Sequence, residues 1–153
     1  MAAFEHVPGT PPESVIELTP NEWTLPFWEA TADHRLVVPR CTGCGAYRMP
    51  PGPFCHVCRM QDIEWVEQSG RGEVYSFTVI RHGVIPDVKE ALPFVAAVVE
   101  LPDTGGVRLV ANIVQCEPEA VRIGMPVELF WNDVREGVSI PCFRPARGAD
   151  DDG

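Results

Sequence analysis

The stretch CTGCGAYRMPPGPFCHVC, residues 41–58, contains two C-x-x-C pairs separated by ten residues. Each C-x-x-C places two sulfur atoms on one tight turn, and two such turns facing each other make the four-thiolate cage of a zinc ribbon. The ten intervening residues include two glycines and three prolines, which allow a short hairpin to return. The spacing therefore predicts a metal site formed by Cys41, Cys44, Cys55 and Cys58.

Other uses of these cysteines fit the stretch less well. A thioredoxin-like redox centre has a single C-x-x-C between a strand and a helix. A disulfide is typical of secreted chains, and the N-terminal residues show no secretory signal. Iron in a rubredoxin-like cage, or a metal-free ribbon, stays open as an alternative. Four thiolates saturate zinc, so the predicted ion is structural, and His56 is expected to be a surface residue.

The residues that follow the two pairs differ. Gly45 follows the first pair, at a position where a left-handed backbone is often required. Arg59 occupies the matching position after the second pair. The second turn therefore departs from the ideal pattern, although all four ligands are present.

The rest of the chain predicts a mainly β fold with short N-terminal helices, a zinc ribbon and then a barrel. Five strand-like segments follow the cysteines, and a short helical turn at 118–125 separates the third from the fourth. This order is that of a five-stranded OB-fold barrel. The expected strands cover residues 72–82, 94–101, 107–114, 126–131 and 138–143.

Residues 19–35 are predicted to be helical. Thr19 is the expected N-cap of a first helix, with Pro20 at its first position, and a second short helix is expected over 26–33. The aromatic residues Trp23, Phe27 and Trp28 either pack on their own domain or form a surface that docks on a partner. The expected organisation is a flexible arm at 1–18, a helical partner-docking segment at 19–35, the zinc ribbon at 36–68, the OB-fold at 69–145 and an acidic tail at 146–153.

Charge and composition narrow the function. The 153 residues carry a formal net charge of −10, which argues against nonspecific binding of nucleic acid, because phosphate contacts need a basic face. A local basic pocket for a small anion stays possible. No segment approaches the roughly 20 apolar residues that span a bilayer, so a cytoplasmic protein is expected.

No catalytic constellation is visible in the sequence. The four histidines lie far apart, and no nucleophile elbow, zinc-protease or P-loop pattern occurs. Cys116 and Cys142 lie in or beside apolar strands and are expected to be buried. We therefore expect no catalytic residue in this chain and no activity of the chain alone.

The order of parts resembles a known family. The segments PFWEATADHRLVVPRCTGCGAYRMPPGPFCHVC (26–58), IEWVEQSGRGEVYSFTVI (63–80) and VRIGMPVEL (121–129) are similar to small bacterial and archaeal proteins long described as a domain of unknown function. The likeness covers about residues 20–145. It implies a helical segment, a rubredoxin-like zinc ribbon and a C-terminal OB-fold.

Members of this family act beside thiolase-superfamily enzymes, including thiolases, acyltransferases and steroid side-chain aldolases. The partner carries the catalytic residues, and the small subunit stabilises it and helps to accommodate acyl-CoA. The resemblance thus implies structural Zn²⁺ on the four cysteines, docking through Trp23, Phe27 and Trp28, and a heterotetramer with a dimeric partner. The partner reaction is thiolysis, acyl transfer, condensation or retro-aldol cleavage.

Two further hypotheses concern ligands. In the accessory-subunit hypothesis, the long loop at 81–93 helps to enclose the acyl thioester, and four basic residues are candidates for binding CoA phosphates: Arg40, Arg48, Arg81 and Lys89. The alternative is a nucleic-acid-binding OB-fold, in which Tyr75 and Phe77 share one face of the first barrel strand and stack on bases. Autonomous thioester hydrolysis is a third, weaker possibility, because it lacks a nucleophile.

Overall fold

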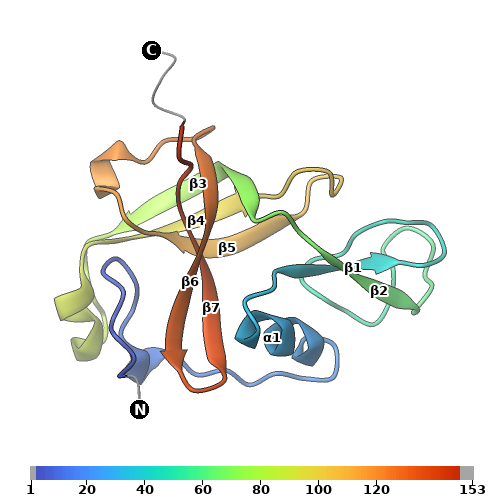
Figure 1. The fold of residues 1–153 in the computed structure, drawn as a ribbon, viewed down its shortest axis with the longest axis horizontal. Helices are drawn as coiled ribbons and strands as arrows, with labels where there is room; N and C mark the ends of the chain where they lie inside the picture. The colour runs from blue at the N-terminus through green and yellow to red at the C-terminus, as the bar shows by residue number, and fades with distance from the viewer. Residues whose placement is uncertain (1–2, 149–153) are drawn as a thin grey trace.

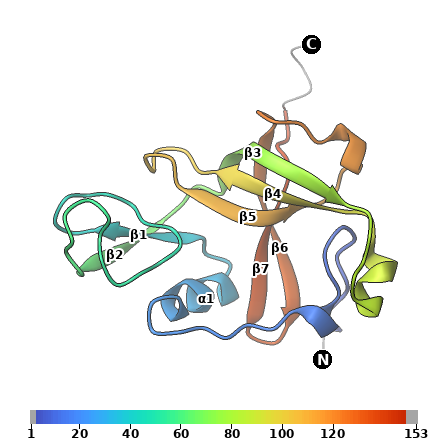
Figure 2. The same ribbon diagram turned by 180° about the vertical axis from the view of Figure 1, so that it is seen from behind.

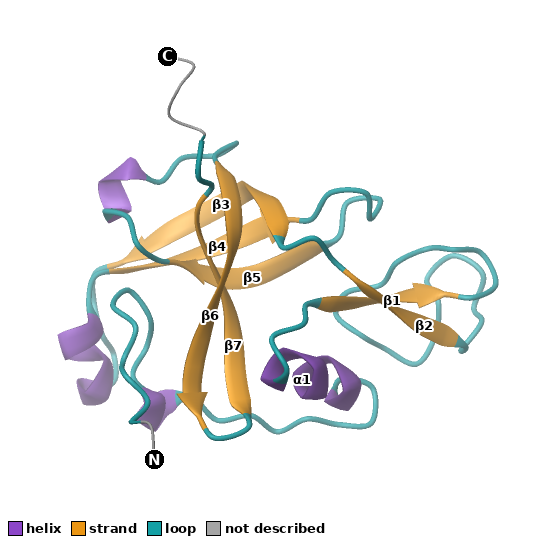
Figure 3. Cartoon of the chain, in the orientation of Figure 1, coloured by secondary structure: helices purple, strands orange, loops and turns teal. Residues whose placement is uncertain are grey.

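The computed structural model describes residues 3–148 and places a two-stranded ribbon beside a five-stranded barrel (Figure 1). A single α-helix lies between the ribbon and the barrel, and short 3₁₀ turns connect some of the strands (Figure 3). The elements in chain order are η1 Glu13–Val15, α1 Leu25–Ala32, β1 Val37–Cys41, β2 Ile63–Glu67, β3 Arg71–Ile80, η2 Pro86–Ala91, β4 Phe94–Glu100, β5 Arg108–Ile113, η3 Pro118–Ala120, β6 Pro126–Arg135 and β7 Val138–Pro145.

The barrel confirms the predicted OB-fold. Its strands follow the order β3-β4-β5-β7-β6, and β6 returns to β3 over Arg71–Glu73. All neighbours are antiparallel except β5 and β7, which run parallel and are joined by the single pair Ile113 and Phe143. The helical turn expected at 118–125 is shorter than predicted, because only η3 is formed there.

One hydrophobic core joins the ribbon base, α1 and the barrel. Along β4, alternate residues point inward, as the period of a half-buried strand requires. Leu36, which precedes β1, is 2% exposed and belongs to the same cluster as Val99 and Phe143 of the barrel, which are 0% exposed. The ribbon and the barrel are therefore packed together rather than separated by a free linker.

The N-terminal helical segment begins later than predicted. The side-chain oxygen of Asn21 accepts hydrogen bonds from the backbone amides of Trp23 and Thr24, both at 3.0 Å. This Asx turn competes with a helix at Thr19, and α1 begins only at Leu25. The first predicted helix is therefore absent, and the second is confirmed.

The end of α1 is attached to the hairpin formed by β6 and β7. His34 follows the helix, and its Nε2 lies 2.7 Å from Oδ1 of Asp133. The imidazole ring also stacks on Trp131, with the ring centroids 5.2 Å apart. These two contacts hold the end of the helix against the barrel, and Figure 1 shows α1 beside β7.

The described part of the predicted flexible arm lies against the barrel. Thr10 is 1% exposed, and both terminal nitrogens of Arg135 donate to the carbonyl oxygen of Ile16, at 3.3 and 3.2 Å. Ser14 also donates to Asp87 of η2 at 3.2 Å. These long-range contacts explain the difference from the prediction. Residues 1–2 of the arm and 149–153 of the predicted tail lie outside the described residues.

A β-bulge in β3 changes the expected placement of its aromatic residues. The pairing with β4 shifts between Val74 and Ser76, so the intervening Tyr75 is exposed. Phe77 instead packs against the hydrophobic core. The two aromatics therefore do not share one face, which removes the stacking platform that the nucleic-acid hypothesis requires.

Within residues 3–148, no helix has both the length and the apolar character needed to cross a bilayer.

Candidate metal centre and adjoining groove

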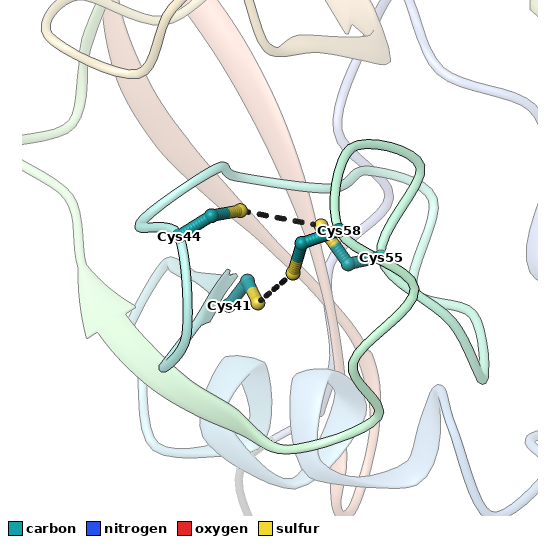
Figure 4. Close-up of side chains that lie close together, drawn as sticks. All are labelled: Cys41, Cys44, Cys55 and Cys58. Atoms are coloured by element: carbon teal, nitrogen blue, oxygen red, sulfur yellow. Dashed lines mark hydrogen bonds between the residues drawn. The ribbon is translucent and has the colours of Figure 1, made fainter.

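The four cysteines of the two C-x-x-C pairs converge on one point (Figure 4). Cys41 ends β1, Cys44 lies in the turn after it, and Cys55 and Cys58 belong to the second turn. Their sulfur atoms all lie within 4.8 Å of one another, and the Cys41–Cys58 and Cys44–Cys55 distances are 3.5 Å. A tetrahedron with metal–sulfur bonds of about 2.3 Å has edges of about 3.8 Å. The cage therefore fits one structural metal ion of zinc size.

The same geometry argues against a disulfide or redox pair. The two sulfur–sulfur contacts at 3.5 Å join one C-x-x-C to the other rather than the two members of a pair. All four cysteines are free thiols. A closed set of four ligands, with no position left for substrate, is typical of a structural site.

The two metal-binding turns have the same backbone conformation. The amide of Gly45 donates to the carbonyl of Cys41 at 2.9 Å, and the amide of Arg59 donates to the carbonyl of Cys55 at 3.0 Å. Gly45 has φ +77° and Arg59 has φ +69°. Arg59 therefore adopts the left-handed conformation that glycine provides in the first turn, which costs a residue with a Cβ roughly 1–2 kcal/mol.

The substitution Arg59→Gly is expected to raise the free energy of unfolding by about 0.5–1 kcal/mol, because relief of the left-handed strain outweighs the added flexibility of the unfolded chain. Gly45→Ala should lower it by about 1 kcal/mol, since it introduces the same strain into open space. Denaturant unfolding of the zinc-loaded proteins measures both. If both substitutions change the free energy of unfolding in the same direction, the left-handed conformation is not the cause.

Backbone amides favour the thiolate form of part of the cage. The amides of Cys58 and Val57 lower the pKa of Cys55 to about 6, and the Val57 nitrogen lies 3.4 Å from its sulfur. The pKa of Cys41 is likewise lowered, chiefly by the amide of Cys44. For Cys44 itself, the amide of Ala46 lowers the pKa, but burial and the neighbouring thiols outweigh it and raise the pKa to about 11. A bound cation would deprotonate this thiol as well.

The remaining cysteines and His56 lie outside the cage. Cys142 is 0% exposed, and burial raises its pKa to about 12. Burial and the charge of Glu117 also raise the pKa of the half-buried Cys116. Raised pKa values make both thiols poor nucleophiles at neutral pH. His56 is exposed, as the sequence predicts.

The four basic residues proposed to bind CoA phosphates do not meet. Arg40 and Arg48 belong to the ribbon, whereas Arg81 directly follows β3 and Lys89 belongs to η2. The segment that contains η2 lies on the side of the barrel away from the ribbon (Figure 1). Arg40 is paired with Glu64 at 2.7 Å, and Arg81 is paired with Glu119 at 2.7 Å. The four residues therefore do not lie around one phosphate site, and the sequence carries no signal for their separation in space. Contact of any one of them with a CoA phosphate stays a proposal.

The aromatic residues of the predicted docking segment are mostly used inside the chain. Phe27 is 4% exposed and contacts Trp28 edge to face, with the ring centroids 5.0 Å apart. Trp28 is half-buried and packs on the core cluster. Phe27 and Trp28 thus pack on their own domain, which is the first of the two alternatives that the sequence left open. Docking on a partner through Trp23, Phe27 and Trp28 stays a proposal, and Trp28 has a second role in the groove described next.

An apolar groove, which we call the β5 groove, runs along five consecutive residues of β5, Arg108–Asn112. Its volume is about 630 Å³, and Arg108 is the one charged residue among the described residues that line it. Val110 is 74% exposed in this groove. The walls include Phe27 and Trp28 of α1, Pro50 and Pro51 of the ribbon loop and Ile140 of β7.

Sequence reasoning missed the β5 groove, although one signal was present. In the alternating strand at 107–114, Val110 is an apolar residue on the outward-facing side. None of the residues of the long loop at 81–93 lines the groove. The loop instead contacts the N-terminal segment through the hydrogen bond between Asp87 and Ser14.

Comparisons with known proteins assign the chain to a family. Residues 28–64 match the rubredoxin-like zinc ribbon domain of ChsH2, and residues 65–132 match the C-terminal OB-fold domain of ChsH2. A DUF35 domain-containing scaffold protein of Methanocaldococcus jannaschii is 36% identical over 102 residues, which are 66% of this chain and 70% of that protein. The chain belongs to the DUF35 family.

Other similar proteins are parts of larger assemblies. The chain is 45% identical over 121 residues to a probable enoyl-CoA hydratase alpha subunit of Thermomonospora curvata. That match covers 78% of this chain but 37% of the length of the hydratase subunit. A solved chain of the Ltp2-ChsH2(DUF35) aldolase is 40% identical, with a TM-score of 0.76, and the match covers 84% of this chain and 98% of that one. The DUF35 fold predicted from the sequence is therefore confirmed.

Proposed function

We propose that this DUF35 chain is a non-catalytic accessory subunit that binds and stabilises a thiolase-superfamily enzyme and helps to accommodate its acyl-CoA substrate. The strongest support is its match to nearly the full length of a chain of the Ltp2-ChsH2(DUF35) aldolase. This relative, an aldolase, favours retro-aldol cleavage over thiolysis, acyl transfer or condensation as the reaction of the partner. The hydratase relative, whose name includes enoyl-CoA, supports an acyl-CoA substrate.

The β5 groove is the surface where we propose that the partner docks. Contiguous exposed apolar surface marks an interaction site, and Val110 is 74% exposed there. The groove volume of about 630 Å³ also suits a small-molecule site. A partner that covers the groove would convert it into an enclosed apolar channel, which excludes water from the acyl thioester.

The metal has an indirect role in this proposal. Met49, Pro50 and Pro51 line the β5 groove and belong to the loop that connects the two C-x-x-C pairs. A structural Zn²⁺ would fix both ends of that loop, because it joins Cys44 to Cys55. The ion thus shapes one wall of the groove and takes no part in the chemical step.

Coexpression with a thiolase-superfamily protein of the same organism tests the proposal. We expect the two chains to coelute in size-exclusion chromatography as a heterotetramer, because thiolase-fold partners are usually dimers. We also expect the activity and thermal stability of the partner to rise when the subunit is present. Separate elution at micromolar concentration, with unchanged partner activity, would show that the proposal is wrong.

A further inference from the structure

A second cleft, which we call the ribbon–barrel cleft, lies between the loop joining the two C-x-x-C pairs and the turn between β4 and β5. These two loops lie on the same side of the molecule in both views of the chain (Figures 1 and 2). The cleft has a volume of about 450 Å³. Among the described residues that line it, none is acidic, and the basic residues are Arg48, His56 and Arg108. This is unusual in a chain with a net charge of −10.

Arg48 is the central observation. It is 6% exposed, and its Nη2 donates to the carbonyl oxygen of Gln61 at 2.9 Å. Its Nε and Nη1 are buried and have no hydrogen-bond partner among the described residues. A buried cation with two unused donors is costly, so each such group requires an explanation. The simplest explanation is that a negatively charged ligand accepts hydrogen bonds from these two nitrogens.

The opposite wall of the cleft supplies further donors. Gly105 and Gly106 form the exposed part of the β4–β5 turn, with φ +69° and +94°. Both glycines lie in the turn, and neither of their backbone amides donates to a backbone carbonyl of residues 3–148. Both glycines are exposed, and no atom beyond their chain neighbours lies within 4 Å of a Cβ built on either, so a ligand has room beside this turn.

Arg108 stands at the rim of the cleft in a fixed position. Its guanidinium lies 3.6 Å from the ring centroid of Tyr75, and its Nε donates to Glu100 at 2.9 Å. Its two terminal nitrogens make no hydrogen bond to another described residue. Stacking and one ion pair therefore orient the side chain while leaving two donors for a ligand.

We propose that the ribbon–barrel cleft binds a phosphate-type oxyanion, with Arg48 and Arg108 as cationic ligands and the amides of Gly105 and Gly106 as neutral donors. Guanidinium groups match the oxygen spacing of phosphate and form strong charge-assisted hydrogen bonds with it. Binding at this position would bridge the ribbon and the barrel.

The cleft continues into the β5 groove, since both are lined by Met49, Pro50 and Arg108. A ligand that fills both would carry a phosphorylated end and an apolar end. This extension to acyl-CoA rests on the proposed function. The oxyanion site itself does not, because it involves residues of this chain alone.

Titration of the zinc-loaded full chain with inorganic phosphate, followed by ¹H–¹⁵N correlation spectra at constant ionic strength, tests the oxyanion site without any partner. We expect saturable shifts of the Gly105 and Gly106 amides and of the Arg48 Nε–H. Arg108→Gln should weaken phosphate binding about tenfold, the loss expected for one charge-assisted contact. Arg122→Gln removes the same charge from an exposed position outside the cleft and should leave binding unchanged.

Two results would overturn the proposal. One is a response to phosphate that does not saturate, or that sodium chloride or acetate reproduces at the same ionic strength. The other is equal weakening by Arg108→Gln and Arg122→Gln, which would indicate a general charge effect. The Arg108 variant keeps the test valid even if replacing the buried Arg48 prevents folding. Metal analysis before and after the titration checks that zinc is retained.

Discussion

Replacement of Cys44 by serine is expected to remove the metal and unfold the ribbon. The substitution leaves three thiolates in a cage whose sulfur atoms lie within 4.8 Å of one another. Structural zinc supplies roughly 10–16 kcal/mol in isolated peptides, and losing even a quarter of this would lower the melting temperature of a chain of this size by about 10 °C, so a fall of at least that size is expected. Metal analysis and thermal unfolding measure the two effects. Partner assembly should fail as well, because the loop between Cys44 and Cys55 forms one wall of the β5 groove.

Cys116→Ser is the matched control for this prediction. Cys116 is half-buried and lies outside the cage, so the same chemical change should leave zinc content and partner assembly intact. A Cys44→Ser protein that loses zinc yet assembles fully with its partner would contradict the structural role of the metal. A variant that assembles but loses only the activity of the complex would assign the metal a part in the chemistry instead.

The substitution Val110→Glu is expected to abolish assembly with the partner while leaving the subunit folded. Val110 is 74% exposed in the isolated chain, so the carboxylate remains in water until a partner covers the groove. Burying an unpaired carboxylate at an interface core costs several kcal/mol, and a loss of about 3 kcal/mol weakens binding by more than 100-fold. Size-exclusion chromatography of the coexpressed chains and titration calorimetry of the purified chains measure this loss.

Ile123→Glu provides a closely matched control. Ile123 is 70% exposed, does not line the β5 groove and follows η3 on the barrel. The same change from an apolar to an acidic side chain should therefore leave partner affinity within about twofold of the natural chain. If both variants lose the partner equally, the groove is not the docking surface. If neither does, the partner binds elsewhere.

The metal cage and the barrel strands could be predicted because their signals are local. The distance of three residues within each C-x-x-C determines the turn, and alternating burial along β4 follows from the strand period. The left-handed backbone at Gly45 could be anticipated for the same reason. Arg59 adopts the same conformation without the glycine that normally indicates it.

Features that depend on residues far apart in the sequence could not be predicted from local patterns. The Asx turn of Asn21 displaces the start of the helix, and the packing of Thr10 and Arg135 orders a segment that looks like a mobile arm. The bulge at Tyr75 reverses the face on which Phe77 lies. The ribbon–barrel cleft joins Arg48 to Arg108 across 60 positions of sequence, so no short motif reports it.

The join between β5 and β7 has a consequence of its own. These strands meet through one residue pair, Ile113 and Phe143, so within residues 3–148 the segment Arg108–Asn112 has no strand neighbour on the side away from β4. The backbone of this segment presents hydrogen-bonding groups in extended form, and such an edge is a template on which another chain can add a strand. The readiness of the subunit to associate is thus a property of how the barrel closes as well as of the side chains that surround it.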